Sequence, residues 1–141
     1  MFIQALHKNF IMPTKATEGS AAYDIYMPED GIILPNSQRA SVINLGFAMA
    51  IPKGFCGLLL PRSSTGAKSG LALNNTAGVI DSDYRGEWQA YLRVHNAEPF
   101  RWKRGDRVLQ LLIVPVADFQ LIQTESLDIT DRIAGFGSTG I

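Results

Sequence analysis

Several features that would indicate common classes of protein are missing from this 141-residue chain. Cys56 is the only cysteine, so the chain can form no internal disulfide and no zinc site built from several thiolates. Thirteen lysines and arginines balance thirteen aspartates and glutamates, which leaves no broad positive field for a nucleic-acid backbone or an anionic membrane. These absences argue against a polymeric nucleic-acid partner. They favour a reducing, cytoplasmic location, which is the host cytoplasm if the source is viral.

Long apolar runs and sustained helical patterns are also missing. No stretch is long enough to span a bilayer, and the first residues lack the features of a signal peptide, so we expect no membrane association. Glycine and proline interrupt the chain so often that no segment keeps an apolar period of 3.6 residues over three turns. The sequence therefore predicts only one short helix, near residues 63–68.

The composition that is present fits a folded globular protein. Hydrophobic residues make up 46% of the chain and charged residues 18%, and the length suffices for one compact core. We therefore expect residues 1–141 to form a single domain. Its last part, residues 131–141, is glycine-rich, and we expect a mobile carboxyl-terminal arm there.

Apolar residues alternating with a period of two predict most of the remaining structure. Within residues 87–95, Trp88, Ala90, Leu92 and Val94 point to one face, which is typical of a half-buried strand.

Other segments carry weaker strand patterns. Residues 47–51 and 57–60, separated by a Pro-Lys-Gly turn, and residues 108–116 predict further strands, with 57–60 fully buried. Many short strands predict an all-β sandwich or barrel of the jelly-roll kind, closed so that few strand edges are exposed.

Three segments carry groups suited to chemistry on a phosphorylated ligand. The segment 78–86 places Asp81 and Tyr84 in a turn, although Asp and Gly also form ordinary hairpin turns. In the segment 61–64, an arginine and two serines open the predicted helix, which suits anion binding or simple capping of the helix by serine. The glycine-rich segment 135–140 can wrap phosphate oxygens with its backbone, or it can be a disordered tail.

Together with two further segments, these three resemble the five motifs of the trimeric dUTPase family, in the same order. The sequences are AAYDIY (21–26), PRSS (61–64), GVIDSDYRG (78–86), GDRVLQ (105–110) and GFGSTG (135–140). The resemblance implies a distorted jelly-roll-like barrel, the β-clip fold, with one short helix. It also implies a homotrimer in which the arm 131–141 closes over a neighbouring subunit's site.

The resemblance implies that the protein hydrolyses dUTP to dUMP and pyrophosphate, which keeps uracil out of DNA and supplies dUMP for dTMP synthesis. Asp81 would activate the water that attacks the α-phosphorus, and Gln110 would help hold this region or a phosphate-bound water. Mg²⁺ would be held mainly by the substrate phosphates, and Asp24 would touch it only through water.

The same resemblance implies which residues bind the substrate. Tyr84 would pack beneath the deoxyribose and exclude a 2′-hydroxyl, and Phe136 would stack on uracil. The phosphate chain would be bound by Arg62, Ser63, Ser64, Arg132, Gly137, Ser138 and Thr139. Uracil would be read by the hairpin 75–89, with Asn75, Val79, Ile80 and Gln89 close to the base.

Two positions depart from the family pattern. Arg132 stands four residues before Phe136 instead of five, which bears on its reach to the γ-phosphate. Ser64 stands where glycine is common, as it does in the related dCTP deaminases, but Tyr91 and Ala67 occupy the places of the glutamate and arginine that deamination needs. Besides a deaminase relative, the alternative is a non-catalytic member of the fold that senses a nucleotide or binds a partner protein.

Overall fold

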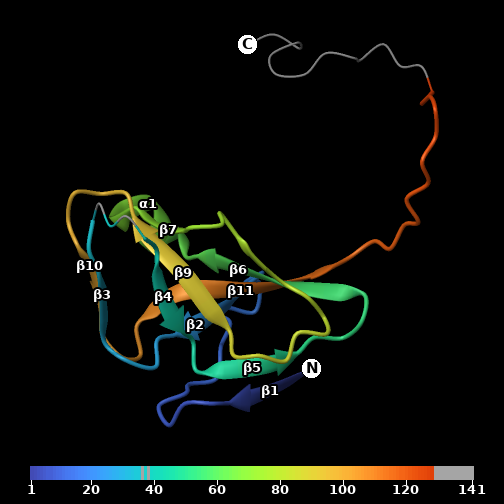
Figure 1. Ribbon diagram of the computed structural model, residues 1–141. Coiled ribbons are helices and arrows are strands. Elements are labelled where there is room, and N and C mark those ends of the chain that lie inside the picture. Colours follow the sequence, from blue (N-terminus) through green and yellow to red (C-terminus); the bar gives the residue numbers. More distant parts are fainter. Residues whose placement is uncertain (36, 38, 129–141) are drawn as a thin grey trace.

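A computed structural model describes residues 1–35, 37 and 39–128 of the chain (Figure 1). Strands dominate this part, and one short helix, α1, interrupts them, which confirms the predicted all-β class. In chain order the elements are β1 (Phe2–Ala5), β2 (Tyr23–Tyr26), β3 (Gly31–Ile33), β4 (Ser41–Asn44), β5 (Phe47–Ala50), β6 (Phe55–Pro61), α1 (Ser63–Ser69), β7 (Leu71–Leu73), β8 (Gly78–Ile80), β9 (Gln89–Val94), β10 (Phe100–Trp102) and β11 (Arg107–Pro115). In the described part of the chain, no helix is long and apolar enough to cross a membrane.

The strands form four antiparallel sheets in a jelly-roll-like arrangement. The largest has the order β2-β11-β6-β8, the next has the order β4-β9-β7, and β1-β5 and β10-β3 form two small sheets. The expectation of a closed barrel is wrong, because these sheets are not joined by strand pairing within the described residues. Several strands have only three or four residues, and such short strands end before a continuous ladder can pass from one sheet to the next.

One apolar core fills the space between the sheets. The side chains of Trp88, Ala90 and Leu92 are completely buried and Val94 is nearly so, which confirms the alternation predicted for β9. The rings of Phe47 and Trp88 pack with centroids 5.3 Å apart. Burial of such large side chains supplies most of the stabilising free energy of a small domain.

The four-stranded sheet has one face on this core and one face away from it. Gly57 and Leu59 of β6 are buried, whereas Leu58 and Leu60 are only half-buried, so the prediction of a fully buried strand over 57–60 is wrong. Cross-strand partners share a face of a sheet, and the pairing is Leu58 with Leu112 and Leu60 with Gln110. We call this second face the outer face; it carries Asp24, Cys56, Leu58, Leu60, Val79, Gln110, Leu112 and Val114.

The chain leaves this sheet at the end of β11. Residues 116–128 run away from the body of the molecule in Figure 1 (orange to red) and belong to no strand or helix. Several of their apolar side chains are exposed: Val116, Phe119, Leu121, Ile122 and Leu127. Exposed apolar side chains in a continuous segment are typical of a surface that is covered by another molecule.

Candidate active site

A buried carboxylate and two arginines meet at one end of the four-stranded sheet. Asp24 is 7% exposed, and its Oδ1 lies 2.7 Å from Nε of Arg62 while its Oδ2 lies 3.0 Å from Nη1 of Arg107. Arg62 also donates a hydrogen bond from Nη1 to the carbonyl oxygen of Arg107 at 3.1 Å. Strand pairing explains the cluster, because β2 and β6 flank β11 on either side. The Arg62 guanidinium is therefore held in one orientation by two acceptors.

The residues next to this cluster tie β6, α1 and β11 together. Gln110 donates from Nε2 to the carbonyl oxygen of Pro61 at 3.0 Å, and Thr65 donates from Oγ1 to the carbonyl oxygen of Val108 at 2.8 Å. Such side-chain to backbone bonds fix the start of α1 against β11. They place the opening of α1 directly beside the arginine cluster.

Ser63 and Ser64 form the first turn of α1, and both are exposed. The residue at the N-cap position is Arg62, which makes no side-chain capping hydrogen bond. Ser63 therefore does not cap the helix, which was the alternative to anion binding. The two hydroxyl groups remain on the surface beside Arg62, as binding of an anion requires.

The predicted catalytic aspartate lies at the other end of β6. Asp81 directly follows β8, and its side chain is exposed. It lines an open depression together with Lys53, Cys56 and Asp118. Its carbonyl oxygen accepts a hydrogen bond from the backbone N–H of Tyr84 at 3.2 Å. This bond closes the turn that carries both residues.

Tyr84 folds back over its own turn. Its hydroxyl donates a hydrogen bond to the carbonyl oxygen of Glu87 at 3.0 Å, and 43% of the residue is exposed. Arg85 donates from Nη1 to the carbonyl oxygens of Ser82 and Tyr84. The turn is thus fixed by local hydrogen bonds, and Tyr84 remains partly exposed.

The residues predicted to read uracil lie along the hairpin with different degrees of exposure. Asn75 lies in an exposed turn, Val79 is 62% exposed, and Ile80 is packed in part against the core. Gln89 donates from Nε2 to Oδ1 of Asn44 on the neighbouring strand β4 at 2.8 Å. Its amide group is therefore engaged within the β4-β9 pair.

One chain does not bring the two ends of the site together. Gly57 pairs with Ile80, next to Asp81, whereas Pro61 pairs with Leu109 at the arginine end. Four residue steps of strand separate Gly57 from Pro61, which corresponds to about 13 Å at ~3.3 Å per residue. Asp81 and Arg62 each lie beyond the respective end of this stretch. The two residues therefore lie at opposite ends of β6, at least this length of strand apart.

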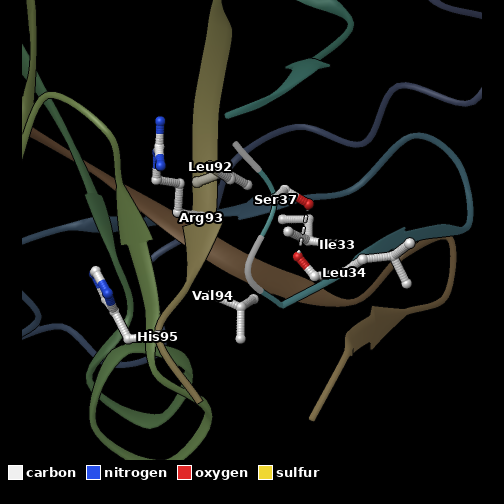
Figure 2. A pocket seen from close by; sticks show the side chains of 7 residues that line it. All are labelled: Ile33, Leu34, Ser37, Leu92, Arg93, Val94 and His95. Carbon is white, nitrogen blue, oxygen red and sulfur yellow. Dashed lines mark hydrogen bonds between the residues drawn. The ribbon is translucent and has the colours of Figure 1, made fainter. Parts of the chain in front are cut away.

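The arm residues, the question of a metal site and a second pocket are separate from the two groups of residues described above. The arm residues Arg132, Phe136, Gly137, Ser138 and Thr139 lie outside the described residues. Among the described residues, no group of three or more His, Cys, Asp or Glu side chains is arranged to hold a metal ion. A separate pocket of about 210 Å³ is lined by Ile33, Leu34, Ser37, Leu92, Arg93, Val94 and His95, whose side chains are drawn in Figure 2. It contains none of the residues predicted to act on a substrate.

The structure also identifies a role that the sequence did not indicate. Arg107 falls inside the segment 105–110, but its sequence position alone does not show that it binds Asp24. A buried carboxylate requires a cationic or hydrogen-bonding partner, but the sequence does not show which residue provides it. The structure supplies two such partners for Asp24.

Comparison with known proteins gives a consistent result. The model of the dUTPase family matches residues 8–140. The deoxyuridine 5′-triphosphate nucleotidohydrolase of Nautilia profundicola is 39% identical, with 98% of this chain and 96% of that protein covered. The corresponding protein of Zymomonas mobilis is 43% identical, with 94% and 90% covered.

Solved structures agree with the sequence relatives. The dUTPase of Staphylococcus bacteriophage 80alpha with dUPNHPP superimposes with a TM-score of 0.88 at 28% identity, covering 99% of this chain and 98% of that chain. A mutant dUTPase from phage phi11 of S. aureus, which coordinates a structural Mg(II) ion, has a TM-score of 0.79 at 25% identity, covering 91% and 98%.

Proposed function

The chain belongs to the dUTPase family, and from this membership we propose that it hydrolyses dUTP to dUMP and pyrophosphate. The observation that carries the proposal is the position of Asp24, Gln110 and Asp81. The first two lie at one end of the outer face and the third lies beside its other end. Arg62 and Arg107 lie on Asp24, which supports anion binding at that end, and the exposed carboxylate of Asp81 supports a base at the other.

Asp81 is the proposed base. A carboxylate oxygen can accept a proton from a water molecule and orient that water toward the α-phosphorus. The water's oxygen forms the new bond to phosphorus, its proton passes to Asp81, and the bond to the departing pyrophosphate breaks. Tyr84, three residues along the same turn, is proposed to pack against the deoxyribose.

The arginine cluster is proposed to bind the phosphate chain. One carboxylate and two guanidinium groups leave a net charge of +1 at this point, and Arg62 is held in place by Asp24 before any ligand arrives. Donors fixed in advance stabilise charge that moves to the leaving group without a further cost of reorganisation. Ser63 and Ser64, two exposed residues, follow the same end of β6.

The residues present are compatible with a magnesium ion that takes most of its ligands from the substrate. Both oxygens of Asp24 already accept from arginines, so this carboxylate is suited to contact an ion only through water. Mg²⁺ commonly keeps several water ligands and binds substrate phosphates. When bound, it would offset the negative charge of the phosphate oxygens.

We propose that the active protein is a homotrimer that shares its sites between chains. Asp81 and Arg62 lie at opposite ends of β6 in one chain, and half-buried leucines line the outer face between them. The exposed apolar residues of 116–128 provide a further surface for a second copy. In this arrangement the arm 131–141 would reach a neighbouring site, where Phe136 would stack on uracil and Arg132, Gly137, Ser138 and Thr139 would bind phosphates.

The proposed substrate also determines where the protein acts. dUTP belongs to the intracellular pool of deoxynucleotides, and we therefore propose that the protein works in the cytoplasm as a single domain spanning residues 1–141. There it would keep uracil out of DNA and supply dUMP.

The test measures pyrophosphate release from dUTP, dCTP, dTTP and UTP with Mg²⁺, with ammonia followed in parallel. We expect release from dUTP alone, without ammonia, from an assembly with three times the chain mass of 15.4 kDa. Binding of dUTP without any release would instead indicate a nucleotide-sensing or partner-binding member of the fold. Ammonia from dCTP would indicate a deaminase.

A further inference from the structure

Gly86 lies against the tip of the Tyr84 side chain. A Cβ atom placed on Gly86 would lie 2.5 Å from Oη and 2.7 Å from Cζ of Tyr84. Carbon atoms at van der Waals contact are about 3.5 to 4.0 Å apart from their neighbours, so any side chain at this position would displace the ring. The tyrosine hydroxyl is at the same time bound to the carbonyl oxygen of Glu87.

The surrounding turn is held independently of the ring. The backbone N–H of Tyr84 donates to Asp81, and Arg85 donates to the carbonyl oxygens of Ser82 and Tyr84. Glu87 accepts a hydrogen bond from the backbone N–H of Gly46 at 3.1 Å, which anchors the end of the turn to the loop before β5. A crowded ring would therefore move while the backbone stays in place.

We propose that Gly86 is a positioning residue that sets the place of the Tyr84 ring and, through it, the selection of deoxyribose over ribose. This inference rests on the proposed function. The absence of a Cβ lets the ring settle onto the backbone of residue 86 and lets its hydroxyl reach Glu87. The two contacts together define where the exposed side of the ring meets a sugar.

The size of the expected displacement suggests its effect. A Cβ on residue 86 would push the ring tip by about 1 Å to restore ordinary contact. A displacement of this size is expected to lower the turnover of dUTP, because misplacement of a substrate by about 1 Å can lower turnover about a hundredfold. Turnover of UTP, which the wild-type protein is proposed to exclude, should change little, or rise if the ring moves out of the way of the 2′-hydroxyl. In both cases the preference for dUTP over UTP falls.

The experiment compares Gly86→Ala with the wild-type protein in the presence of Mg²⁺. We expect the ratio of kcat/KM for dUTP to that for UTP to fall about tenfold or more, mainly through kcat for dUTP. Gly19→Ala is the matched control, because a Cβ there meets nothing within 4 Å, and its ratio should equal that of the wild type. An unchanged ratio in Gly86→Ala would overturn the inference.

A second pair of variants separates a positional effect from general damage. Tyr84→Phe keeps the ring but removes Oη, which is the atom closest to the added Cβ. The Gly86→Ala substitution should therefore lower the ratio less in the Tyr84→Phe background than in the wild type. Equal effects in both backgrounds would mean that residues 84 and 86 act independently, against the inference.

A crystal structure of Gly86→Ala distinguishes failure of this inference from failure of the proposed function. If the wild-type protein releases no pyrophosphate from dUTP, the proposed function is wrong and the role in sugar selection falls with it. The positional part is still decided by the ring. A displaced ring without the bond to Glu87 supports it, and a ring that has not moved overturns it.

Discussion

The two ends of strand β6 differ in how firmly contacts within one chain hold the side chains there. At the Pro61 end, Asp24 is buried and is held by two arginines. At the Gly57 end, Asp81 is exposed and its side chain lines an open depression. The difference shows that contacts within one chain hold the side chains at the Pro61 end and leave the side chain of Asp81 exposed.

This difference follows from the chemistry required at each end. A guanidinium that must bind a phosphate chain benefits from being fixed in advance, and a buried carboxylate fixes it strongly. A base that activates water must instead stay ionised, so burial without a cation would work against it. The comparison predicts that variants at the two ends fail in different ways.

The largest expected effect is on turnover at the exposed end. Asp81→Asn should lower kcat for dUTP by about 10²- to 10⁴-fold, because the amide cannot accept the proton of the attacking water. The variant should still bind dUTP, as measured by calorimetry. Asp118→Asn, which changes another carboxylate of the same depression, is the control. Turnover at the wild-type rate in Asp81→Asn would remove Asp81 from the mechanism.

Mixing variants from the two ends should restore activity that neither variant has alone. Asp81→Asn and Arg62→Gln subunits, unfolded together and refolded in equal amounts, should regain about one quarter of the wild-type sites if each site takes its base and its arginine from different chains. Pyrophosphate release from the mixture measures this recovery. A mixture no more active than its separately refolded components would place both groups in one chain, contrary to the separation along β6.

The sequence predicted the strands better than it predicted their surroundings. Trp88, Ala90 and Leu92 alternate strictly, and β9 buries all three. The apolar run 57–60 predicted a buried strand, yet Leu58 and Leu60 are half-buried. A run of apolar residues indicates that both faces are to be covered, but it does not show whether the cover comes from the same chain.

The candidate site was predictable to the same extent. The predictions for Asp81, Tyr84 and Arg62 rest on short local motifs and on the family resemblance that these motifs carry. The pairing of Arg107 with Asp24 joins residues 83 positions apart. It depends on the register of β2 against β11, which the sequence does not reveal.

A smaller effect, on stability, is expected at the buried end. Asp24→Asn should lower the free energy of unfolding by about 3 kcal/mol, because it leaves two arginines without their shared carboxylate. Arg107→Gln should cost less, about 1 kcal/mol, since Arg62 still binds Asp24. Urea denaturation measures both, with Arg101→Gln on β10 as the control for loss of an exposed arginine. Equal costs for Asp24→Asn and Arg101→Gln would contradict a structural role for the cluster.

The smallest effect is expected at an exposed carboxylate, which serves as the reference for Asp24. The backbone N–H of Arg104 and the ammonium group of Lys103 both bind Asp30 and lower the pKa of its carboxyl group from its usual 3.8. A lowered pKa in the folded state adds stability above the unfolded pKa, and this stability is lost as the pH falls through the folded pKa. Asp30→Asn should therefore lower Tm slightly at about pH 7, and the difference from the wild type should shrink below pH 3.8. Thermal unfolding at several pH values measures this. A Tm difference that grows on acidification would contradict a stabilising role for the Asp30 carboxylate. A Tm difference that shrinks gives the size of effect expected for an exposed carboxylate, with which the loss of Asp24 is compared.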